Sequence, residues 1–395
     1  MDNKIYIIFA VIAFVQKVNS GLLDCRISPY GNLSPIVVLH NQNEFLYPEF
    51  HDLDLRFPPG TSVDFLCPGG EIIIGSNTYT DISMATCIVG SLFEIHSQHV
   101  DFNDITCSRI PDKNARYTGL DCENNGKEIE IGFETSNNFL RTVLVCFDQS
   151  TQLALHTRVN ITRAINKRVT STPRPSFIQG RSLYSITSVN SYYTRVNQRT
   201  TINNQLGLPA ESTQYINTNT YYLARGHMTA RSDNFYPSEQ NSTFFFVNAA
   251  PQWQIFNAGN WYKVEISVRD YAEANDVDLI QWTGVYGVLT LPDSRGHPTE
   301  LYIYDVNGVK NLPVPEIFWK VVYDPISLRG IAIIGLNNPY AKSYTVFCDD
   351  VSDQIDWIHV AWDSVPEGLI YACEIEDFKK TVSYVPSFPV SGLLV

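Results

Sequence analysis

Residues 221–233 read YYLARGHMTARSD, and they place one histidine in a short stretch flanked by arginine. The whole chain contains only 8 histidines. Side chains alternate along a strand, so Arg225 and His227 are expected to point to the same face. Such a pair can act together on one phosphate. A polar residue where a strand happens to end is the alternative, and the surrounding sequence has to decide between the two.

The second informative stretch is FFFVNAAPQWQIFNAGNWYKVE, residues 244–265. From residue 253 to residue 274, apolar side chains recur at spacings of three, four or six, with charged residues between them. This period predicts a helix over residues 253–274. Asn257 follows His227 by thirty residues, and Glu265 lies eight residues further on, near the same helix face.

Elsewhere in residues 178–395, strand-like runs accompany this helical pattern. Strand-like runs are STFFFVN, GVYGVLTL, TELYIYDV, FWKVVYD and GIAIIGL. Together with the helix, they predict an α+β domain over residues 178–395, with the helix against a sheet.

The first part has a different character. Short alternating runs such as VDFLC, EIIIG and RTVLVCF are broken by PPG, PGG and NNG, which predicts an all-β module over residues 21–165. Six of the eight cysteines fall in this module. Residues 166–177 contain VTSTPRPS, which is typical of a linker.

The first twenty residues predict a secretion signal. Lys4 precedes an apolar run over residues 5–15, and cleavage is expected after Ser20. The run is shorter than the roughly 20 residues that a membrane span needs. We therefore expect a secreted, extracellular protein that has no membrane association after signal cleavage.

The cysteines and sequons agree with export. An even number of cysteines in an oxidising compartment is expected to pair, and Cys348 with Cys373 is the pair expected in the second part. The pairing of the other six stays open. Sequons for glycosylation begin at Asn32, Asn160 and Asn241, and Pro35 makes the first of these the least favourable.

The net charge of −13 argues against a polyanionic partner, but its distribution does not. Residues 149–210 contain no Asp or Glu. The basic residues of this interval are Arg158, Arg163, Lys167, Arg168, Arg174, Arg181, Arg195 and Arg199. Local positive potential matters more for phosphate attraction than the total charge does. A solvated basic linker is the alternative for this run.

The stretches ARGHMTA, FFFVNAAPQWQIFNAGNWYKVE and FWKVVYD together resemble the DNA/RNA non-specific endonucleases. The resemblance runs from about Ser176 to the C-terminus, and N-x-x-P-Q from Asn248 and N-x-G-x-W-x-x-x-E from Asn257 are both in register. It implies a ββα-metal (His-Me finger) fold and a secreted, metal-dependent nuclease. The cysteine-rich first part resembles the extra N-terminal region of arthropod members found in gut and saliva.

The resemblance also implies roles for individual residues. His227 would be the general base, Asn257 the ligand of Mg²⁺ (with Mn²⁺ as a substitute), and Glu265 a partner of the metal's waters. Arg225 would bind the scissile phosphate, and Asn248 would hold one of the loops in place.

The phosphate contacts are less fully fixed by the resemblance. Arg231 could add a phosphate contact, with a solvated loop arginine as the alternative. The family's second phosphate-binding arginine would be Arg181, Arg195 or Arg199. The implied substrates are double- and single-stranded DNA and RNA, cut without sequence preference to leave 5′-phosphate ends.

One position departs from the family motif. The family's D-R-G-H begins here with Ala224, so an acid that could orient the loop or its arginine is absent. We expect this change to lower the rate without removing the base or the metal. Two alternatives to a nuclease follow: a nucleic-acid-binding protein on the same fold with weakened or lost activity, and a structural or receptor-like glycoprotein.

Overall fold

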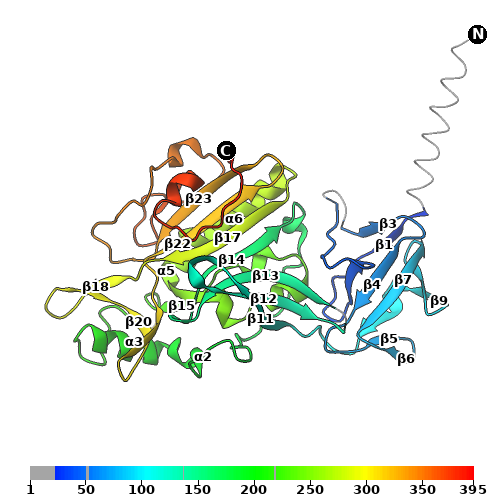
Figure 1. Ribbon diagram of the computed structural model, residues 1–395, viewed down its shortest axis with the longest axis horizontal. Helices are drawn as coiled ribbons and strands as arrows, with labels where there is room; N and C mark the ends of the chain where they lie inside the picture. The colour runs from blue at the N-terminus through cyan, green and yellow to red at the C-terminus, as the bar shows by residue number, and fades with distance from the viewer. Residues whose placement is uncertain (1–22, 50–52, 137, 218) are drawn as a thin grey trace, which may run out of the picture. The chain divides into compact units, whose positions relative to one another are not determined.

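The computed structural model describes residues 23–49, 53–136, 138–217 and 219–395. The expected secretion signal therefore lies outside the described residues. The chain divides into two compact units (Figure 1). The first contains residues 23–113, 132–141 and 236–238, and the second contains the remainder. Within the described part of the chain, no helix is long and apolar enough to cross a membrane.

The first unit is built from antiparallel strands. Its largest sheet has the order β2–β4–β7–β8–β9, formed by β2 (Ile36–Leu39), β4 (Ser62–Leu66), β7 (Ile82–Val89), β8 (Leu92–Ile95) and β9 (Gln98–Asp101). Smaller sheets pair β1 (Cys25–Ile27) with β3 (Leu55–Phe57), and β5 (Ile72–Ile74) with β6 (Asn77–Tyr79) and β10 (Ile105–Cys107).

Disulfides and aromatic side chains hold the first unit together. Cys25 is bonded to Cys87, and Cys67 to Cys107. The buried rings of Phe65 and Phe93 meet edge to face with centroids 5.4 Å apart. The cross-links stabilise this unit in addition to its buried apolar core. The prediction of a disulfide-rich β region is confirmed.

Most of a long sheet with the order β11–β12–β13–β14–β17–β22–β23–β24 belongs to the second unit. The strands are β11 (Asn114–Asp121), β12 (Lys127–Glu134), β13 (Phe139–Asp148), β14 (Leu153–Ile161), β17 (Leu279–Tyr286), β22 (Ile317–Asp324), β23 (Arg329–Leu336) and β24 (Ile370–Cys373), and β25 (Gly392–Leu393) pairs with β23 in parallel. Neighbouring strands from β13 to β24 are antiparallel.

Every residue of β22 is buried because both faces of the sheet are covered. On one face, Phe318 packs against Trp261 of α6 (Asn260–Ala274), with ring centroids 5.8 Å apart. On the other face, Trp319 packs against Phe378 of α7 (Ile375–Phe378) at 5.9 Å. The expected arrangement of a helix against a sheet is confirmed.

A ββα unit lies beside this sheet. Strands β15 (Leu223–His227) and β16 (Ala249–Trp253) pair antiparallel, and α5 (Gln254–Asn257) and then α6 follow (Figure 1). The single helix predicted over residues 253–274 is wrong in one respect, because it breaks at Gly259. A β-carbon there would overlap the carbonyl oxygen of Ile255 and lie 2.9 Å from that of Glu367. Only glycine fits this turn.

The start of α6 is fixed by Asn260, which is fully buried. Its Nδ2 donates to the carbonyl oxygens of Ala361 and Gly368, both at 2.7 Å, and its Oδ1 accepts from the Ala361 amide at 3.1 Å. One amide side chain thus ties the helix to the loop over residues 361–368.

The expected strand STFFFVN, residues 242–248, is also wrong. Residues 246–248 form a 3-10 turn, and Phe245 contributes only an isolated bridge to Ile178. The Asn248 side chain bonds to backbone groups of Thr243 and Thr229, which replaces regular ladder pairing at this point. The three phenylalanines are buried in the turn instead.

Several short elements complete the chain. The helices are α2 (Val189–Tyr192), α3 (Arg195–Gln205) and α4 (Pro237–Ser242). The short strands are β18 (Thr290–Pro292), β19 (Pro298–Glu300), β20 (Tyr302–Val306) and β21 (Val309–Pro313). The 3-10 turns are η1 (Phe102–Asp104), η2 (Glu123–Asn125), η3 (Ile165–Lys167), η4 (Arg231–Asp233), η5 (Phe246–Asn248) and η6 (Ser352–Gln354).

The structure divides the chain earlier than the expected boundary at residue 165. Residues 114–131 and 142–165 belong to the second unit, where residues 156–161 of β14 pair with β17. The disulfide between Cys122 and Cys146 therefore lies in the second unit. Local strand patterns were the same on both sides of this boundary, so they could not reveal which sheet each strand joins.

The expected linker, residues 166–177, is packed rather than spanning a gap. The carbonyl oxygen of Val169 accepts from Gln240 Nε2 at 2.8 Å, and that of Thr172 accepts from Arg231 Nη2 at 2.6 Å. Proline and serine in this stretch fix an irregular path over the second unit.

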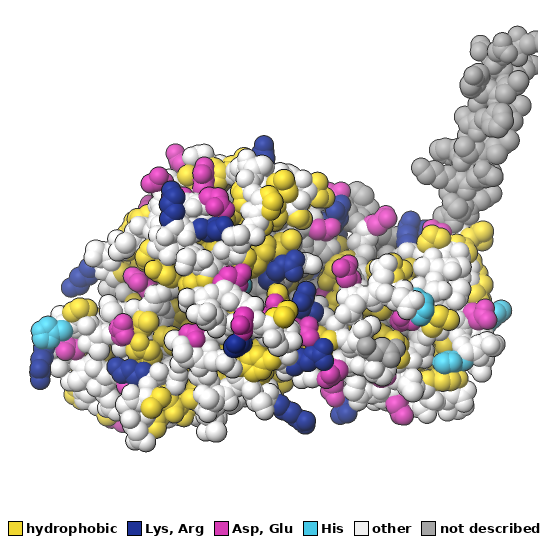
Figure 2. All heavy atoms as spheres, viewed as in Figure 1, with side chains coloured by type: hydrophobic (Ala, Val, Ile, Leu, Met, Phe, Trp, Pro, Cys, Tyr) yellow, Lys and Arg dark blue, Asp and Glu magenta, His cyan; other side chains and the backbone are white. Residues whose placement is uncertain are grey.

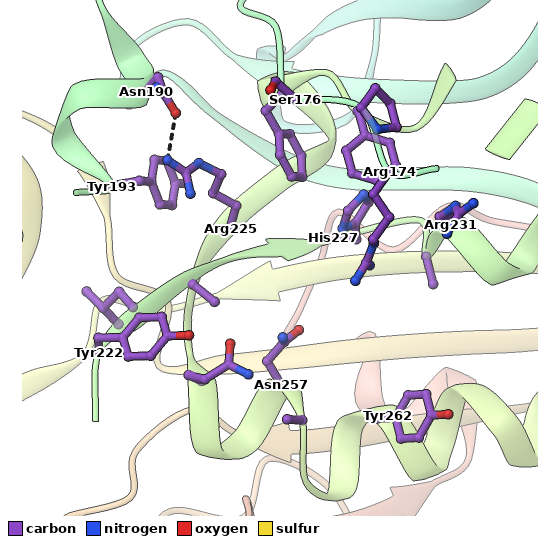
Figure 3. Close-up of a pocket in the computed structure, with 18 of the residues that line it drawn as sticks. Arg174, Ser176, Asn190, Tyr193, Tyr222, Arg225, His227, Arg231, Asn257 and Tyr262 are labelled. Carbon is purple, nitrogen blue, oxygen red and sulfur yellow. Dashed lines mark hydrogen bonds between the residues drawn. The ribbon is translucent and has the colours of Figure 1, made fainter. Parts of the chain in front are cut away.

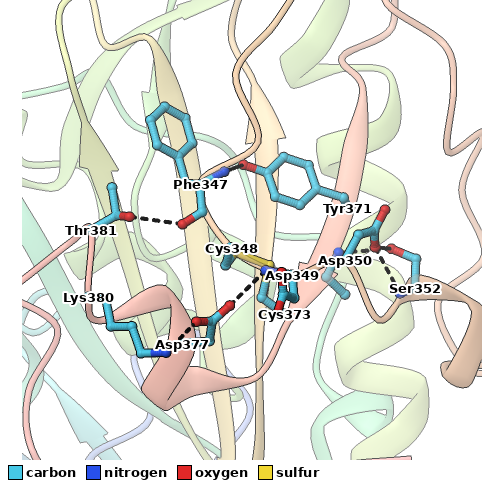
Figure 4. Close-up of a disulfide and its surroundings, with 11 residues drawn as sticks. Phe347, Cys348, Asp349, Asp350, Ser352, Tyr371, Cys373, Asp377, Lys380 and Thr381 are labelled. Carbon is cyan, nitrogen blue, oxygen red and sulfur yellow. Dashed lines mark hydrogen bonds and ion pairs between the residues drawn. A yellow bond between two sulfur atoms is a disulfide. The ribbon is translucent and has the colours of Figure 1, made fainter.

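The second unit also carries the disulfide between Cys348 and Cys373, the pair expected from the sequence (Figure 4). Hydrogen bonds surround it: Thr381 Oγ1 donates to the Phe347 carbonyl at 2.9 Å, and the Asp349 amide donates to Asp377 Oδ2 at 2.7 Å. The disulfide joins the irregular segment before residue 352 to β24, and the two hydrogen bonds join it to the residues that follow β24.

Candidate active site

A cleft of about 1030 Å³ opens in the second unit along the ββα elements (Figure 3). Strand β15, the first turn of α3, the α5–α6 junction and the segment 174–177 contribute to its walls. The charged and polar side chains that line it are Arg174, Ser176, Asn190, Thr194, Arg195, Arg225, Arg231, Ser232, Gln254, Asn257 and Glu265, together with His227 and the tyrosines Tyr193, Tyr222 and Tyr262.

Strand β15 presents Arg225 and His227 to this cleft from alternate positions, as the sequence predicted (Figure 3). Gly226 between them lies against the neighbouring strand. A β-carbon at Gly226 would overlap the side chain of Gln252 in β16. The glycine of the R-G-H motif is therefore required by packing, and it lets the two strands approach closely.

His227 lies between two aromatic rings. Its ring centroid is 4.8 Å from that of Phe177 and 4.9 Å from that of Phe244. Although the residue as a whole is half-buried, its Nε2 atom is buried and has no hydrogen-bond partner among the described residues. Such an orphaned nitrogen is available to an incoming group.

The surroundings of His227 lower its pKa to about 3. Burial is the main cause, the positive charges of Arg174 and Arg231 add to it, and Asp233 opposes it. The sequence predicted an imidazole with an ordinary pKa near 6.5, and the structure corrects that expectation. The imidazole is neutral, and so able to accept a proton, over the whole neutral pH range.

Arg225 is held by neutral groups. Its Nη2 donates to Asn190 Oδ1 at 2.6 Å (Figure 3), and its guanidinium carbon lies 5.5 Å from the ring of Tyr193 and 5.9 Å from that of Phe246. Burial lowers its pKa, yet guanidinium stays charged at any physiological pH. Neutral partners orient this arginine while leaving its positive charge for an anion.

Asn257 and Glu265 both reach the cleft, although the helix breaks between them. Asn257 is the last residue of α5, and Glu265 lies in the second turn of α6. Burial raises the pKa of Glu265 to about 7, with Asp233 adding to the rise and the positive charges of Lys320 and Arg269 opposing it. The carboxylate therefore exchanges its proton near neutral pH.

A group of buried charges interacts with Glu265. Arg269 Nη1 bonds to Asp233 Oδ1 at 2.7 Å, and both residues are almost fully buried. Lys320, which is completely buried in β22, donates to Thr283 Oγ1 at 2.8 Å. The sequence contained a signal for these buried charges, namely a lysine within the apolar run FWKVV. A lysine in a buried strand needs polar or charged partners, because unpaired buried lysines are rare.

Asn248 does not line the cleft. It is fully buried: its Oδ1 accepts from the Thr229 amide, and its Nδ2 donates to the carbonyl oxygens of Thr229 and Thr243, all at 2.9 Å. Its contacts are those of a residue that holds a loop in place, and none of them reaches the cleft. It holds the segment that follows His227, as a positioning residue.

The arginines of the cleft differ in part from those expected. Arg231 and Arg195 line it, and the Arg195 guanidinium lies 4.2 Å from the ring of Tyr222. Arg181 is exposed and lies outside the lining, and Arg199 Nε donates to the Ile216 carbonyl instead. Arg181 therefore lies apart from the arginines that line the cleft, and its role in phosphate binding stays a prediction.

Arg174 was missed because its neighbours resemble a linker. It lines the cleft, and its charge helps to lower the pKa of His227. Its guanidinium carbon lies 6.0 Å from the ring of Phe244, which also contacts His227. The only available signal was its place in the acid-free interval, which it shares with seven other basic residues.

Two basic residues of that interval form ion pairs with acids from elsewhere in the chain. Arg163 pairs with Asp278 at 3.1 Å, and Lys167 pairs with Glu273 at 3.4 Å. On the face shown in Figure 2, basic and acidic side chains are interspersed. The cleft itself gathers four arginines, whose positive charges attract a polyanion.

The sequons differ in accessibility. Asn32 and Asn160 are exposed, whereas Asn241 is half-buried in α4. Glycosylation at these positions stays a prediction.

The donors in the cleft fit a magnesium ion. Mg²⁺ accepts few protein oxygens and keeps most of its water, and the Asn257 amide oxygen with the Glu265 carboxylate offers that kind of donor. Among the described residues, a different cluster, Cys122, Glu123 and Cys146, has ligand atoms close together. Its two sulfurs form a disulfide, so they are unavailable to a metal.

The chain is similar to known nucleases and to salivary proteins. Residues 124–378 match the family model of the DNA/RNA non-specific endonucleases. The chain is 27% identical over 330 residues to a salivary endonuclease of Lutzomyia longipalpis, covering 81% of this chain and 73% of that protein. The salivary protein Tsal2A of Glossina morsitans morsitans is 21% identical over 370 residues, with 92% of each chain covered.

Two further similarities cover less of the chain. The mitochondrial nuclease EXOG of Homo sapiens is 27% identical over 188 residues, which is 43% of this chain and 50% of EXOG. A solved structure of an EndoG/EndoGI complex aligns with a TM-score of 0.40 and 16% identity over 64% of this chain and 87% of that chain.

Proposed function

The chain belongs to the DNA/RNA non-specific endonuclease family, and we propose that it is a secreted, Mg²⁺-dependent endonuclease that cleaves DNA and RNA without sequence preference. The products would carry 5′-phosphate ends. Family membership supports the nuclease activity, and the salivary relatives together with four disulfides support export.

One observation carries the proposal. Arg225, His227, Asn257 and Glu265 line the same cleft, although forty residues separate Arg225 from Glu265. Phosphodiester hydrolysis needs a base for water, a cation beside the phosphate, and help for the departing oxygen. These four side chains offer a base, a cation and two oxygen donors at one place.

His227 Nε2 removes the proton from the attacking water in this proposal. A base with a pKa of about 3 is weak, but the negative charge of a bound phosphodiester beside it raises that pKa. Arg225 donates hydrogen bonds to the phosphate, and Arg174 and Arg231 attract the strand on either side of the histidine.

Asn257 would hold the magnesium ion, and Glu265 would accept hydrogen bonds from its waters. When bound, the ion stabilises negative charge on the phosphate and on the departing oxygen. Contacts to phosphates carry no base sequence, which is why cleavage would be non-specific.

The second candidate is a nucleic-acid-binding protein with weakened activity. Ala224, in place of the family's acid, favours it. An incubation of supercoiled plasmid and of double-stranded RNA, with Mg²⁺, with Mn²⁺ or with EDTA, separates the two. We expect cleavage of both nucleic acids with either ion, none with EDTA, and 5′-phosphate on the products. Nucleic acid that is retarded in a gel but uncut would support the second candidate.

The pH dependence of cleavage should follow the ionisation of the Glu265 carboxyl group. Its raised pKa of about 7 means that it is protonated below this pH and ionised above it. If the ionised form is required, kcat/KM rises with pH through about 7 and levels off above it. His227 contributes no inflection there, because its own pKa in the free protein lies near 3.

The matched variant for this profile is Glu265→Gln, which keeps the shape and removes the titration. Its activity should be lower and flat between pH 6 and about 8. An inflection near pH 7 that persists in Glu265→Gln would assign the titration to another group.

A further inference from the structure

Gln252 is an anomaly in the core of the ββα unit. The residue is fully buried in β16, yet neither its Nε2 nor its Oε1 has a hydrogen-bond partner among the described residues. Buried side-chain amides are nearly always bonded, because leaving donor and acceptor unsatisfied in a low-dielectric interior is costly. The position of this side chain therefore requires an explanation.

The strand register supplies one. Ala224 lies directly opposite Gln252, and Gly226 lies opposite Ala250. Side chains directly opposite each other in an antiparallel pair share one face, with β-carbons about 4.5–5.5 Å apart. Gln252 thus lies beneath the strand segment that carries Arg225 and His227, against the bare backbone of Gly226.

The methyl group of Ala224 cannot form a hydrogen bond with the side-chain amide of Gln252 on the opposite strand. A side chain with an acceptor three bonds beyond the α-carbon, as in Asp or Asn, would lie within reach of Gln252 Nε2 across the pair. Ala224 is only half-buried and borders the cleft, so a carboxylate there could keep its second oxygen hydrated.

We propose that Gln252 is a positioning residue for strand β15 whose hydrogen-bond partner is missing, because Ala224 stands directly across the strand pair from its buried, unpartnered amide. A carboxylate at position 224 completes the pair and fixes the strand that presents Arg225 and His227. The effect on catalysis rests on the proposed nuclease function, whereas the pairing itself does not.

The expected effect is on the rate of the chemical step rather than on affinity. Arg225 and His227 keep their own side-chain surroundings on the opposite face of the strand, so substrate binding changes little. Their alignment in the transition state depends on how firmly β15 is held, and small misplacements of reacting groups lower kcat strongly.

A double-mutant cycle with Ala224→Asp and Gln252→Leu tests this pairing. In the presence of Gln252, Ala224→Asp should raise kcat by about threefold or more with KM unchanged, within the range expected for coupled neighbours. It should also raise Tm by about 2–4 °C. Both gains should disappear when Gln252 is replaced by Leu.

Two matched variants complete the design. Ala224→Asn offers the same acceptor without charge and should reproduce the gain in Tm, whereas Ala224→Leu has similar size and no acceptor and should give none. A gain from Asp that persists in the Gln252→Leu background would overturn the pairing, as would the absence of a gain from both Asp and Asn.

The thermal measurements keep the two proposals distinguishable. If none of the proteins cleaves nucleic acid with Mg²⁺, the proposed nuclease function fails. The coupling between positions 224 and 252 in Tm still supports or overturns the pairing in that case.

Discussion

Replacing His227 by alanine should abolish cleavage while leaving nucleic-acid binding in place. We expect kcat to fall by about 10²–10⁴-fold, the usual contribution of a general base. The physical reason is that Nε2 of His227 is a buried, unpartnered nitrogen that can accept a proton, which the guanidinium groups of the cleft cannot do. Those arginines remain in the variant, so Kd for a short duplex should change little.

The measurement is plasmid cleavage at saturating substrate, together with a binding titration of the same variant. His297→Ala is the matched control, because that histidine is exposed on a short hairpin and does not line the cleft. It should retain full activity. Cleavage by His227→Ala at the rate of the parent protein would contradict the assignment of the base.

Replacing Arg225 by alanine should lower kcat by about 10²–10³-fold, as removal of one donor to a developing negative charge does. The guanidinium is oriented by Asn190 and lies near the rings of Tyr193 and Phe246, so its geometry is fixed before substrate arrives. Lysine cannot reproduce its planar, two-donor contact, so Arg225→Lys should recover only part of the loss.

Steady-state kinetics on a defined oligonucleotide would measure both variants. Arg181→Ala is the control, since Arg181 is an exposed arginine outside the cleft and should have parental kinetics. Asn190→Ala should fall between the two, because the guanidinium remains but loses its hydrogen bond. A loss in Arg181→Ala as large as in Arg225→Ala would indicate a general charge effect rather than a specific phosphate contact.

The sequence singled out several residues that line the cleft because its motifs have fixed spacing, and their roles stay predictions. Alternation along a strand was enough to place Arg225 and His227 on one face. The interval between His227 and Asn257 then indicated the ββα unit. Gly226 and Gly259 belong to the same motifs because backbone or side-chain atoms occupy the space where a β-carbon would lie.

Other features depended on partners far away in the sequence. Arg174 lies in a stretch with the composition of a linker, and only packing against Phe244 brings it to the cleft. The strands between residues 114 and 161 had the same pattern as those before them. Which sheet they join was decided by pairing with β17, more than a hundred residues later.

The sequence by itself determined the family, several of the residues that line the cleft, and a disulfide-rich β region, because each depends on residue type and local spacing. Tertiary structure alone decided the pKa of His227, the charge available in the cleft, and the orphaned amide of Gln252 opposite Ala224. These properties depend on burial and on neighbours from distant segments. A charge or a hydrogen bond is set by what surrounds a group in space, and a linear pattern does not contain that information.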